Sequence, residues 1–378
     1  MKKMLFVSPR NPFLNRYSGD VIRSKKFVEA FKKKYKVTLI TTENSYLNKK
    51  FSNLKLITFK NENFIFKLIF IFTSFLKLQP LQLGYFYSSD IRNFIKKNFK
   101  SYDVVFCQSV RVAQYVLDLK IRKILDMGDL YSNNYAQTYK NKNIFSPSKF
   151  LYFIESKFIR KYENLCFAKF DRILLFSKKE INSIKINKKK VKQINFGIDQ
   201  IKKKFRYNNK NNKIIFIGNI KYLPNRIACK NFIKKILPEV NRINKNIEFH
   251  IIGEISKIDK FLWQNKKVKI HGKIKNLEPF LSGVFCGLAN LSVSSGIQTK
   301  LLTYMSYGIP SISSNQVIEN FDSIKSSSLP TYKNKEDFIR LILKLKNNKN
   351  FSQSISKKSL KIIKKFKWSE VLKNIVKI

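Results

Sequence analysis

The residues best suited to binding chemistry lie in residues 294–310, where a glycine stands just before a predicted helix. Gly296 lets the backbone approach a ligand closely because it has no side chain. The helix predicted at 298–307 begins with amides that lack an intrahelical partner, and these amides and the helix dipole attract anions. Lys300 adds a full positive charge, and Gly308 is suited to end the helix. The pattern predicts an anion site, and its alternative is an ordinary turn and helix without a ligand.

Strands and helices alternate along the first half of the chain. Short apolar runs at 4–8 and 36–41 predict strands buried on both faces, and the helical repeat at 21–34 lies between them. This order is typical of a parallel sheet with right-handed crossovers. Further strands are predicted at 104–107, 123–126 and 172–177. The first domain is therefore predicted to be doubly wound α/β.

The pattern restarts after a Lys- and Asn-rich stretch at 200–212, which is a predicted linker. Strands are predicted at 213–218, 247–253, 268–272, 284–290 and 311–313, with helices at 226–236 and 298–307. The predicted boundaries are 1–199 for the first domain, 200–212 for the linker, 213–356 for the second domain and 357–378 for a basic helical tail. Because ligands bind at the carboxyl ends of strands in such sheets, sites are expected at strand-to-helix junctions.

The stretch at 294–310 resembles the donor-binding loop and helix of family 4 retaining glycosyltransferases. The family form is Gly-Ile-x-Asn-Lys-hydrophobic-hydrophobic-Glu-Ala-Met-Ala-x-Gly-x-Pro. Other segments resemble the family in the same order: 215–225 with its Pro-Asn pair, 237–238, 251–253 and 271–277. In the first half, the resemblance extends to Ser18, Gly19 and Asp20 with Arg23, to 81–87 and to 126–132. It covers nearly the whole chain.

The resemblance implies a GT-B fold, in which two doubly wound Rossmann-like domains face each other across a cleft and a C-terminal helix follows. It implies that the second domain binds a nucleotide-diphosphate sugar, with the diphosphate over the first amides of helix 298–307 and main-chain atoms holding the base. The implied donor-binding residues are Gly19, Gly218, Lys221, Lys273, Ile274, Gly296, Ile297, Gln298, Thr299, Lys300 and Thr303. Asp126 and Asp129, on the acceptor side, would orient an acceptor hydroxyl, although acidic residues at strand ends often only cap helices.

The implied reaction is sugar transfer with retention to a saccharide or lipid-linked acceptor, in cell-surface polysaccharide biosynthesis. Positive charge on the leaving diphosphate would stabilise the transition state, so no metal and no other cofactor is predicted. The four cysteines are far apart in the sequence and predict no zinc site or disulfide framework. A pyridine-nucleotide dehydrogenase is disfavoured because no Gly-x-Gly-x-x-Gly follows the first strand.

The chain departs from the family at two positions, where Ser295 and Thr303 stand in place of glutamates. The second glutamate normally accepts hydrogen bonds from the ribose hydroxyls. A threonine there is shorter and uncharged, so donor affinity is expected to fall by ~1.5–3 kcal/mol unless another group substitutes. This departure motivates an alternative, a catalytically impaired GT-B-fold binding protein that is recruited to an anionic membrane.

The charge balance is strongly basic, with 76 Lys and Arg against 24 Asp and Glu and a net charge of +52. Such a field attracts polyanions, including nucleic acid, anionic lipid and phosphorylated substrates. The excess is spread along the chain among many Asn, Ile and Phe residues, which also suits a drift toward A/T-rich codons. Basic motifs interleaved with aromatic residues are absent, so nucleic acid is not an expected partner.

The most apolar window, residues 64–78, is interrupted by Lys67 and Lys77 and is too short for the ~20 apolar residues of a spanning helix. It predicts either a buried helix of the first domain or a helix that lies in a membrane interface. The apolar run at 4–7 is also too short for a signal peptide. We therefore expect a cytoplasmic protein, with peripheral attachment to the inner face of the membrane as a separate prediction.

Overall fold

The computed structural model describes residues 1–14, 19–44, 46–141, 146–202, 204–292, 294, 296–321, 324 and 328–375. Two positions named from the sequence, Ser18 and Ser295, lie outside the described residues. The chain divides into two compact units. Unit 1 comprises Met1–Phe196 together with Trp368–Ile378, and unit 2 comprises Gly197–Lys367.

Unit 1 is built on an eight-stranded sheet in the order β3-β4-β2-β1-β5-β6-β7-β8. The strands are β1 (Lys2–Val7), β2 (Tyr35–Glu43), β3 (Leu47–Phe51), β4 (Leu54–Lys60), β5 (Val104–Gln108), β6 (Arg122–Gly128), β7 (Arg172–Leu175) and β8 (Val191–Gln193). Neighbouring strands are parallel except for β3 and β4, which pair antiparallel. The sequence missed β3 because its side chains are mostly exposed on the sheet edge, which leaves no apolar pattern.

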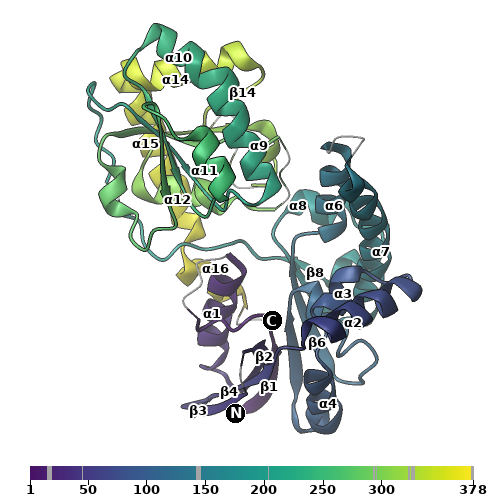
Figure 1. The fold of residues 1–378 in the computed structure, drawn as a ribbon. Helices are drawn as coiled ribbons and strands as arrows, with labels where there is room; N and C mark the ends of the chain where they lie inside the picture. The colour runs from purple at the N-terminus through teal and green to yellow at the C-terminus, as the bar shows by residue number, and fades with distance from the viewer. Residues whose placement is uncertain are drawn as a thin grey trace. The chain divides into compact units, whose positions relative to one another are not determined.

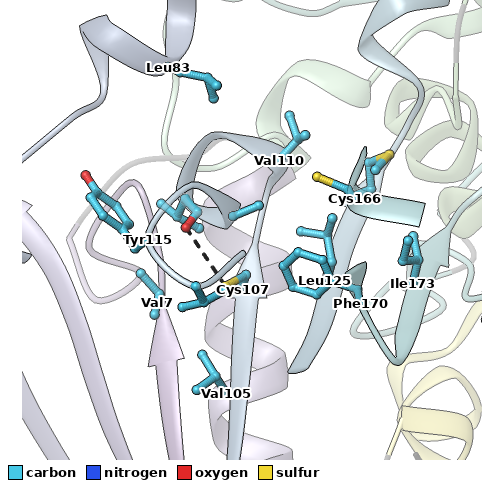
Figure 2. Close-up of a cluster of buried hydrophobic side chains, with 14 of the residues drawn as sticks. Val7, Leu83, Val105, Cys107, Val110, Tyr115, Leu125, Cys166, Phe170 and Ile173 are labelled. Carbon is cyan, nitrogen blue, oxygen red and sulfur yellow. Dashed lines mark hydrogen bonds between the residues drawn. The ribbon is translucent and has the colours of Figure 1, made fainter. Parts of the chain in front are cut away.

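Helices cover both faces of this sheet (Figure 1). They are α1 (Gly19–Phe31), α2 (Phe64–Leu76), α3 (Leu81–Tyr85), α4 (Ser89–Asn98), α5 (Val110–Ala113), α6 (Tyr131–Asn141), α7 (Pro147–Lys169), α8 (Lys178–Ser183) and α16 (Trp368–Ile375). On one face, Val7, Val105 and Cys107 pack with residues of α5 and α7, including Cys166, and Figure 2 shows this cluster. On the other face, Phe6 stacks on Phe106 with ring centroids 4.9 Å apart.

The C-terminal segment corrects the predicted domain boundaries. Residues 357–378 do not form one tail, because helix α15 (Lys349–Ile363) belongs to unit 2 and α16 returns to unit 1. The reason is the buried Trp368, whose ring lies 6.4 Å from Phe27 of α1 and 5.3 Å from Phe196. Burial of an indole ring removes a large apolar surface from water, which holds α16 against α1.

Unit 2 is a six-stranded, fully parallel sheet in the order β11-β10-β9-β12-β13-β14. The strands are β9 (Lys213–Ile217), β10 (Glu248–Ile252), β11 (Val268–Gly272), β12 (Val284–Ala289), β13 (Ser311–Ser314) and β14 (Thr331–Tyr332). The helices include α9 (Leu223–Asn231), α10 (Leu237–Ile243), α11 (Lys257–Trp263), α12 (Thr299–Tyr307), α13 (Asn315–Ile318), α14 (Lys335–Asn347) and α15. The predicted linker is bound to this unit, since the amides of Lys202 and Phe205 donate to the carbonyls of Ser306 and Tyr307.

Helix α12 is fixed to the sheet by Tyr304. Its hydroxyl donates to the carbonyl of Leu288 in β12 and accepts from the amide of Ile217 in β9, at 3.1 and 2.9 Å. Beneath the ring lies Gly287, where an added Cβ would stand 2.6 Å from the tyrosine ring. At the far end of the helix, Gly308 has the left-handed φ of 71° that the sequence predicted. The start of α12 is therefore held at a defined place over β9 and β12.

The apolar window at 64–78 forms helix α2, and Ser74 is the one buried residue within it. Most of its large apolar side chains are exposed, so the interpretation as a buried helix is wrong. Among the residues that the structure describes, no helix has the length and apolar character needed to cross a bilayer.

Candidate functional site

The carboxyl edge of the unit 2 sheet is closed by two glycines in backbone contact. Gly218 follows β9 and Gly253 follows β10. At Gly253, where φ is 144°, an added Cβ would lie 1.8 Å from the carbonyl oxygen of Gly218. Any side chain here would force the two strand ends apart, so the edge keeps bare backbone at the place where a ligand approaches such a sheet.

Lys300 lies directly beside this edge. Its Nζ donates to Oδ1 of Asn225 at 2.6 Å and stands 4.4 Å from the centroid of the Phe216 ring. An added Cβ at Gly218 would meet Nδ2 of Asn225 at 2.9 Å and Cε of Lys300 at 3.5 Å, so these residues converge on one point. Burial lowers the pKa of Lys300 to about 7. Among the described residues, no carboxylate forms an ion pair with this ammonium group, which therefore favours an incoming anion.

The loop before α12 has the geometry of an anion-binding helix start. Gly296 is buried with φ at 64°, and Thr299 at the first helical position is exposed. Ser294 anchors the loop, because its Oγ accepts from Nε2 of Gln298 and from Nδ2 of Asn320, both at 3.2 Å. Ile297 is half-buried. The structure thus brings the predicted residues of this loop together with Lys300 and Gly218 at one helix start.

Two further predicted lysines flank the edge on exposed loops. Lys221 pairs with Glu254 at 2.7 Å, and this ammonium, with a smaller contribution from Lys273, lowers the pKa of the Glu254 carboxyl. The sequence did not point to Glu254, which follows the β10 glycine. Ile274 packs instead against the hydrophobic cluster that contains Tyr304, so a role in base binding would use its main chain, as predicted.

Thr303 lies half-buried on α12, one turn beyond the helix start. Its Oγ1 donates to the carbonyl of Thr299 at 3.0 Å, so its hydroxyl proton is used inside the helix. The lone pairs of that oxygen are the part of the side chain left to accept a hydrogen bond. A glutamate at this position would project further and carry a charge.

In unit 1, the structure corrects the expectation for Asp126. Both of its oxygens accept from the Arg23 guanidinium, at 2.7 and 2.8 Å, and both side chains are only 2% exposed. Arg23 also donates to the Asn195 carbonyl at 3.0 Å and lies over the rings of Phe27 and Phe176. The Asp126 carboxylate is therefore not presented to an acceptor hydroxyl. It closes the core and positions Arg23.

Asp129, the second predicted carboxylate, lies three residues further along the chain, directly after β6. Its Oδ1 is buried and has no hydrogen-bond partner among the described residues. Burial raises the pKa of Asp129 to about 7, although Arg23 acts in the opposite direction. The pKa of the neighbouring Glu180 is also raised, by burial and by the proximity of Asp129. Asp129 can therefore hold a proton near neutral pH.

A polar cavity that the sequence did not reveal lies at the carboxyl ends of β1, β2 and β4, with a volume of about 240 Å³. Its walls are Pro9, Arg10, Thr42, Glu43, Asn61, Glu62, Lys67, Tyr85, Phe86 and Tyr87. The mixture of carboxylate, amide, cation and aromatic ring is the kind that binds the hydroxyl groups and apolar faces of sugars. Strand β4 was not predicted, and without it the residues that follow it could not be placed beside Arg10.

Gly19 begins α1. Because it belongs to unit 1, its predicted approach to the donor phosphates stays a prediction. Among the described residues, no three histidine, cysteine, aspartate or glutamate side chains group so that they could hold a metal ion. The expectation of a metal-free reaction likewise stays a prediction.

Unit 2 contains a region that is similar to a known protein family. Residues 211–348 match the family model described as glycosyl transferases group 1. This region contains the glycine edge, Lys300 and the start of α12. No curated protein sequence matches the chain.

Solved structures are similar over almost the whole chain. Sucrose-phosphate synthase from Thermosynechococcus elongatus has a TM-score of 0.74 at 11% identity, covering 100% of this chain and 98% of that one. HepE from Anabaena, solved with UDP and glucose, has a TM-score of 0.68 at 10% identity, covering 100% and 99%. WaaG, a glycosyltransferase involved in lipopolysaccharide biosynthesis, has a TM-score of 0.68 at 10% identity, covering 99% and 98%. The predicted GT-B architecture, with two parallel-sheet α/β domains and a helical C-terminus, is confirmed.

Proposed function

We propose that the protein is a glycosyltransferase that moves a sugar from a nucleotide-diphosphate donor to a saccharide or lipid-linked acceptor. The observation that carries this proposal is Lys300, a buried cation without a carboxylate partner among the described residues, fixed beside the Gly218 edge. It lies within the segment that matches the glycosyl transferases group 1 model.

The chemistry of this arrangement suits a diphosphate leaving group. As the bond from the anomeric carbon to the phosphate oxygen breaks, negative charge grows on the diphosphate. The amides at the start of α12 and the Lys300 ammonium are already in place for that charge, so little reorganisation is needed during the reaction. The UDP held in the HepE structure supports a nucleotide sugar as the class of donor.

We propose further that the acceptor sugar binds in the polar cavity of unit 1. Arg10, Glu43 and Glu62 offer charged partners for sugar hydroxyls, and Tyr85 and Tyr87 offer ring faces for stacking and hydroxyls for hydrogen bonds. Asp129 does not line this cavity, so its role as an acceptor-side carboxylate stays a prediction.

Retention at the anomeric carbon is proposed from the resemblance of residues 294–310 to the retaining family. A role in cell-surface polysaccharide biosynthesis is proposed in part from the shared fold with WaaG, which acts in lipopolysaccharide biosynthesis. We also propose a cytoplasmic location, because the proposed donors, nucleotide sugars, are used as substrates in that compartment.

The test is a panel of nucleotide sugars that differ in base and sugar, incubated with the purified full chain. We expect at least one donor to bind and to be hydrolysed slowly, and proton NMR of the first-formed sugar should show the anomeric configuration of the donor. Lys300→Met should abolish this activity, whereas the exposed Lys221→Met should retain most of it. Absence of binding across the panel would overturn the proposal, and an inverted product would overturn retention alone.

A second function is favoured by Thr303, whose short side chain replaces a glutamate and is bonded within its own helix. Under this alternative the protein binds a nucleotide sugar without turnover. The Thr303→Glu variant distinguishes the two functions. If the wild type transfers sugar, the threonine is tolerated; if only the variant does, the natural chain is a binding protein.

A further inference from the structure

An exposed apolar face lies where helices α2 and α7 run past each other in unit 1. Its members are Phe64, Ile65, Leu68, Ile69, Phe72 and Leu76 of α2 with Phe150 and Leu151 of α7, and we call it the α2–α7 face. Phe64 is 74% exposed, Phe72 62% and Phe150 68%. Contiguous apolar surface of this kind on a soluble protein marks a site of interaction.

A groove of about 400 Å³ runs along the middle of the face. It is lined on one side by Leu68, Phe72 and Phe75 of α2, and on the other by Phe150, Leu151 and Ile154 of α7. The wall is almost entirely apolar, so it suits hydrocarbon and offers little to a polar ligand.

The exposure is fixed by the fold and does not come from a loosely attached helix. At Gly84 of α3, an added Cβ would lie 2.3 Å from the carbonyl oxygen of Phe70, so α2 rests directly on the α3 backbone. The Phe70 ring packs on Tyr87 with centroids 4.7 Å apart, and Phe75 approaches Phe158 of α7 at 6.5 Å. The inner side of α2 is thus anchored, and its other apolar residues are held outward.

We propose that the α2–α7 face docks on an anionic lipid bilayer. With 13 residues, α2 is about 20 Å long, so it would lie along the interface with its apolar side chains among the acyl chains. Lys67 lies on α2 and Lys77 is its C-cap residue, and on α7 Lys157 and Lys161 follow Phe150 and Ile154 after two helical turns on the same side. These lysines can reach lipid phosphates while the aromatic residues enter the bilayer.

The net charge favours a lipid bilayer over a second copy of the chain as the partner of this face. Each copy carries a net charge of +52, so two copies that approach through this face repel each other over a long range. An anionic bilayer has the opposite sign and attracts the same charge. The combination of exposed aromatic residues and excess lysine therefore fits a lipid surface.

Docking through α2 also bears on where the acceptor binds, and this step rests on the proposed function. Lys67 of α2 lines the polar cavity as well, and its Nζ lies 5.3 Å from the centroid of the Tyr85 ring in that cavity. Docking through α2 would place the cavity beside the headgroups, where a lipid-linked saccharide presents its sugar.

The experiment is flotation of the full chain with vesicles of phosphatidylcholine alone or mixed with phosphatidylglycerol, at low salt. We expect binding to the mixed vesicles that weakens as salt is added. Ile65→Ser combined with Phe72→Ser should lower the binding constant about 10-fold or more, because two apolar side chains no longer enter the bilayer. The matched control replaces Ile258 and Phe261 of α11 by serine, two side chains that are 69% and 85% exposed in unit 2, and should bind like wild type.

The proposal is overturned if the protein ignores the mixed vesicles, or if the α11 control loses as much binding as the α2 variant. It is also overturned if sedimentation shows a wild-type dimer that the α2 variant separates, since a second copy would then cover the face. Hydrolysis of free nucleotide sugar by the α2 variant should equal that of wild type. Failure of docking is therefore distinguishable from failure of the proposed enzymatic function.

Discussion

Each unit buries a cation in the first turns of a helix, and the two cations are held differently. Arg23 on α1 has a full carboxylate partner in Asp126 and two carbonyl acceptors behind it. Lys300 on α12 has an amide oxygen of Asn225 and the face of Phe216, and no carboxylate ion-pair partner among the described residues. Both side chains are buried to a similar degree.

The difference shows how one architecture provides two kinds of site. A buried cation paired with an internal carboxylate is electrically satisfied and serves to hold the structure together. A buried cation without such a partner is costly in the free protein, and an arriving anion removes that cost. The ion pair therefore has a structural role in unit 1, and Lys300, which lies beside the Gly218 edge, is the proposed binding centre of unit 2.

The largest expected effect comes from breaking the internal pair. Arg23→Leu leaves the Asp126 carboxylate buried without a partner and should lower the free energy of unfolding by about 3–5 kcal/mol. Urea unfolding measures the loss. The double variant Arg23→Leu/Asp126→Leu should recover most of it, and Arg10→Leu, which breaks the exposed pair with Asp20, should change stability by about 0–1 kcal/mol. A double variant as unstable as the single one would contradict this view of the pair.

Replacing Lys300 should have the opposite effect. Anion binding should weaken, and the free energy of unfolding should not fall. Lys300→Met should weaken binding of inorganic pyrophosphate by about 1.5–3 kcal/mol, or roughly 10- to 150-fold, because a charged hydrogen bond is lost. Its urea midpoint should stay equal to that of wild type or rise. Calorimetric titration of pyrophosphate gives the affinity, with Lys221→Met as the exposed control that keeps it. A strongly destabilised Lys300→Met would show that Lys300 is a structural cation like Arg23.

The titration of Lys300 gives a smaller effect that depends on pH. Its folded pKa of about 7 lies below the usual lysine value, so above pH 7 the unfolded chain binds one more proton than the folded chain. Stability should therefore rise by about 1 kcal/mol between pH 7 and 8 relative to Lys300→Met. Pyrophosphate affinity should fall over the same range relative to that variant, because the anion requires the protonated amine. Parallel pH profiles of the two proteins would exclude Lys300 as the titrating group.

The smallest expected effect concerns the polar cavity of unit 1. Tyr85→Phe removes one hydroxyl and keeps the ring, so KM for the acceptor should rise about threefold to tenfold, the value of a single hydrogen bond. Binding of the donor should not change. Tyr46→Phe alters a tyrosine that is 61% exposed and does not line the cavity, and serves as the control. An unchanged acceptor KM would place the acceptor elsewhere.

The sequence alone determined most strands of both sheets and the helix at the candidate site, although it missed the largely buried strand β4. Apolar runs predicted these strands because a strand covered on both faces needs apolar residues on both sides. Gly308 predicted the end of helix 298–307 because few other residues adopt the left-handed conformation found there. Lys300 was correctly placed at that helix start, since three residues of chain separate it from Gly296.

Only the tertiary structure decided which distant residues meet. Arg23 and Asp126 lie 103 positions apart, and they pair because the fold brings the side chain of Arg23 on α1 to the carboxylate of Asp126 on β6. The polar cavity needs three strand ends side by side, and one of those strands, β4, was not predicted. The sequence also left undecided whether α2 is buried or exposed, because the same apolar residues suit a buried helix and a surface helix. In the structure, the inner side of α2 rests on the backbone at Gly84, and most of its other apolar side chains are exposed.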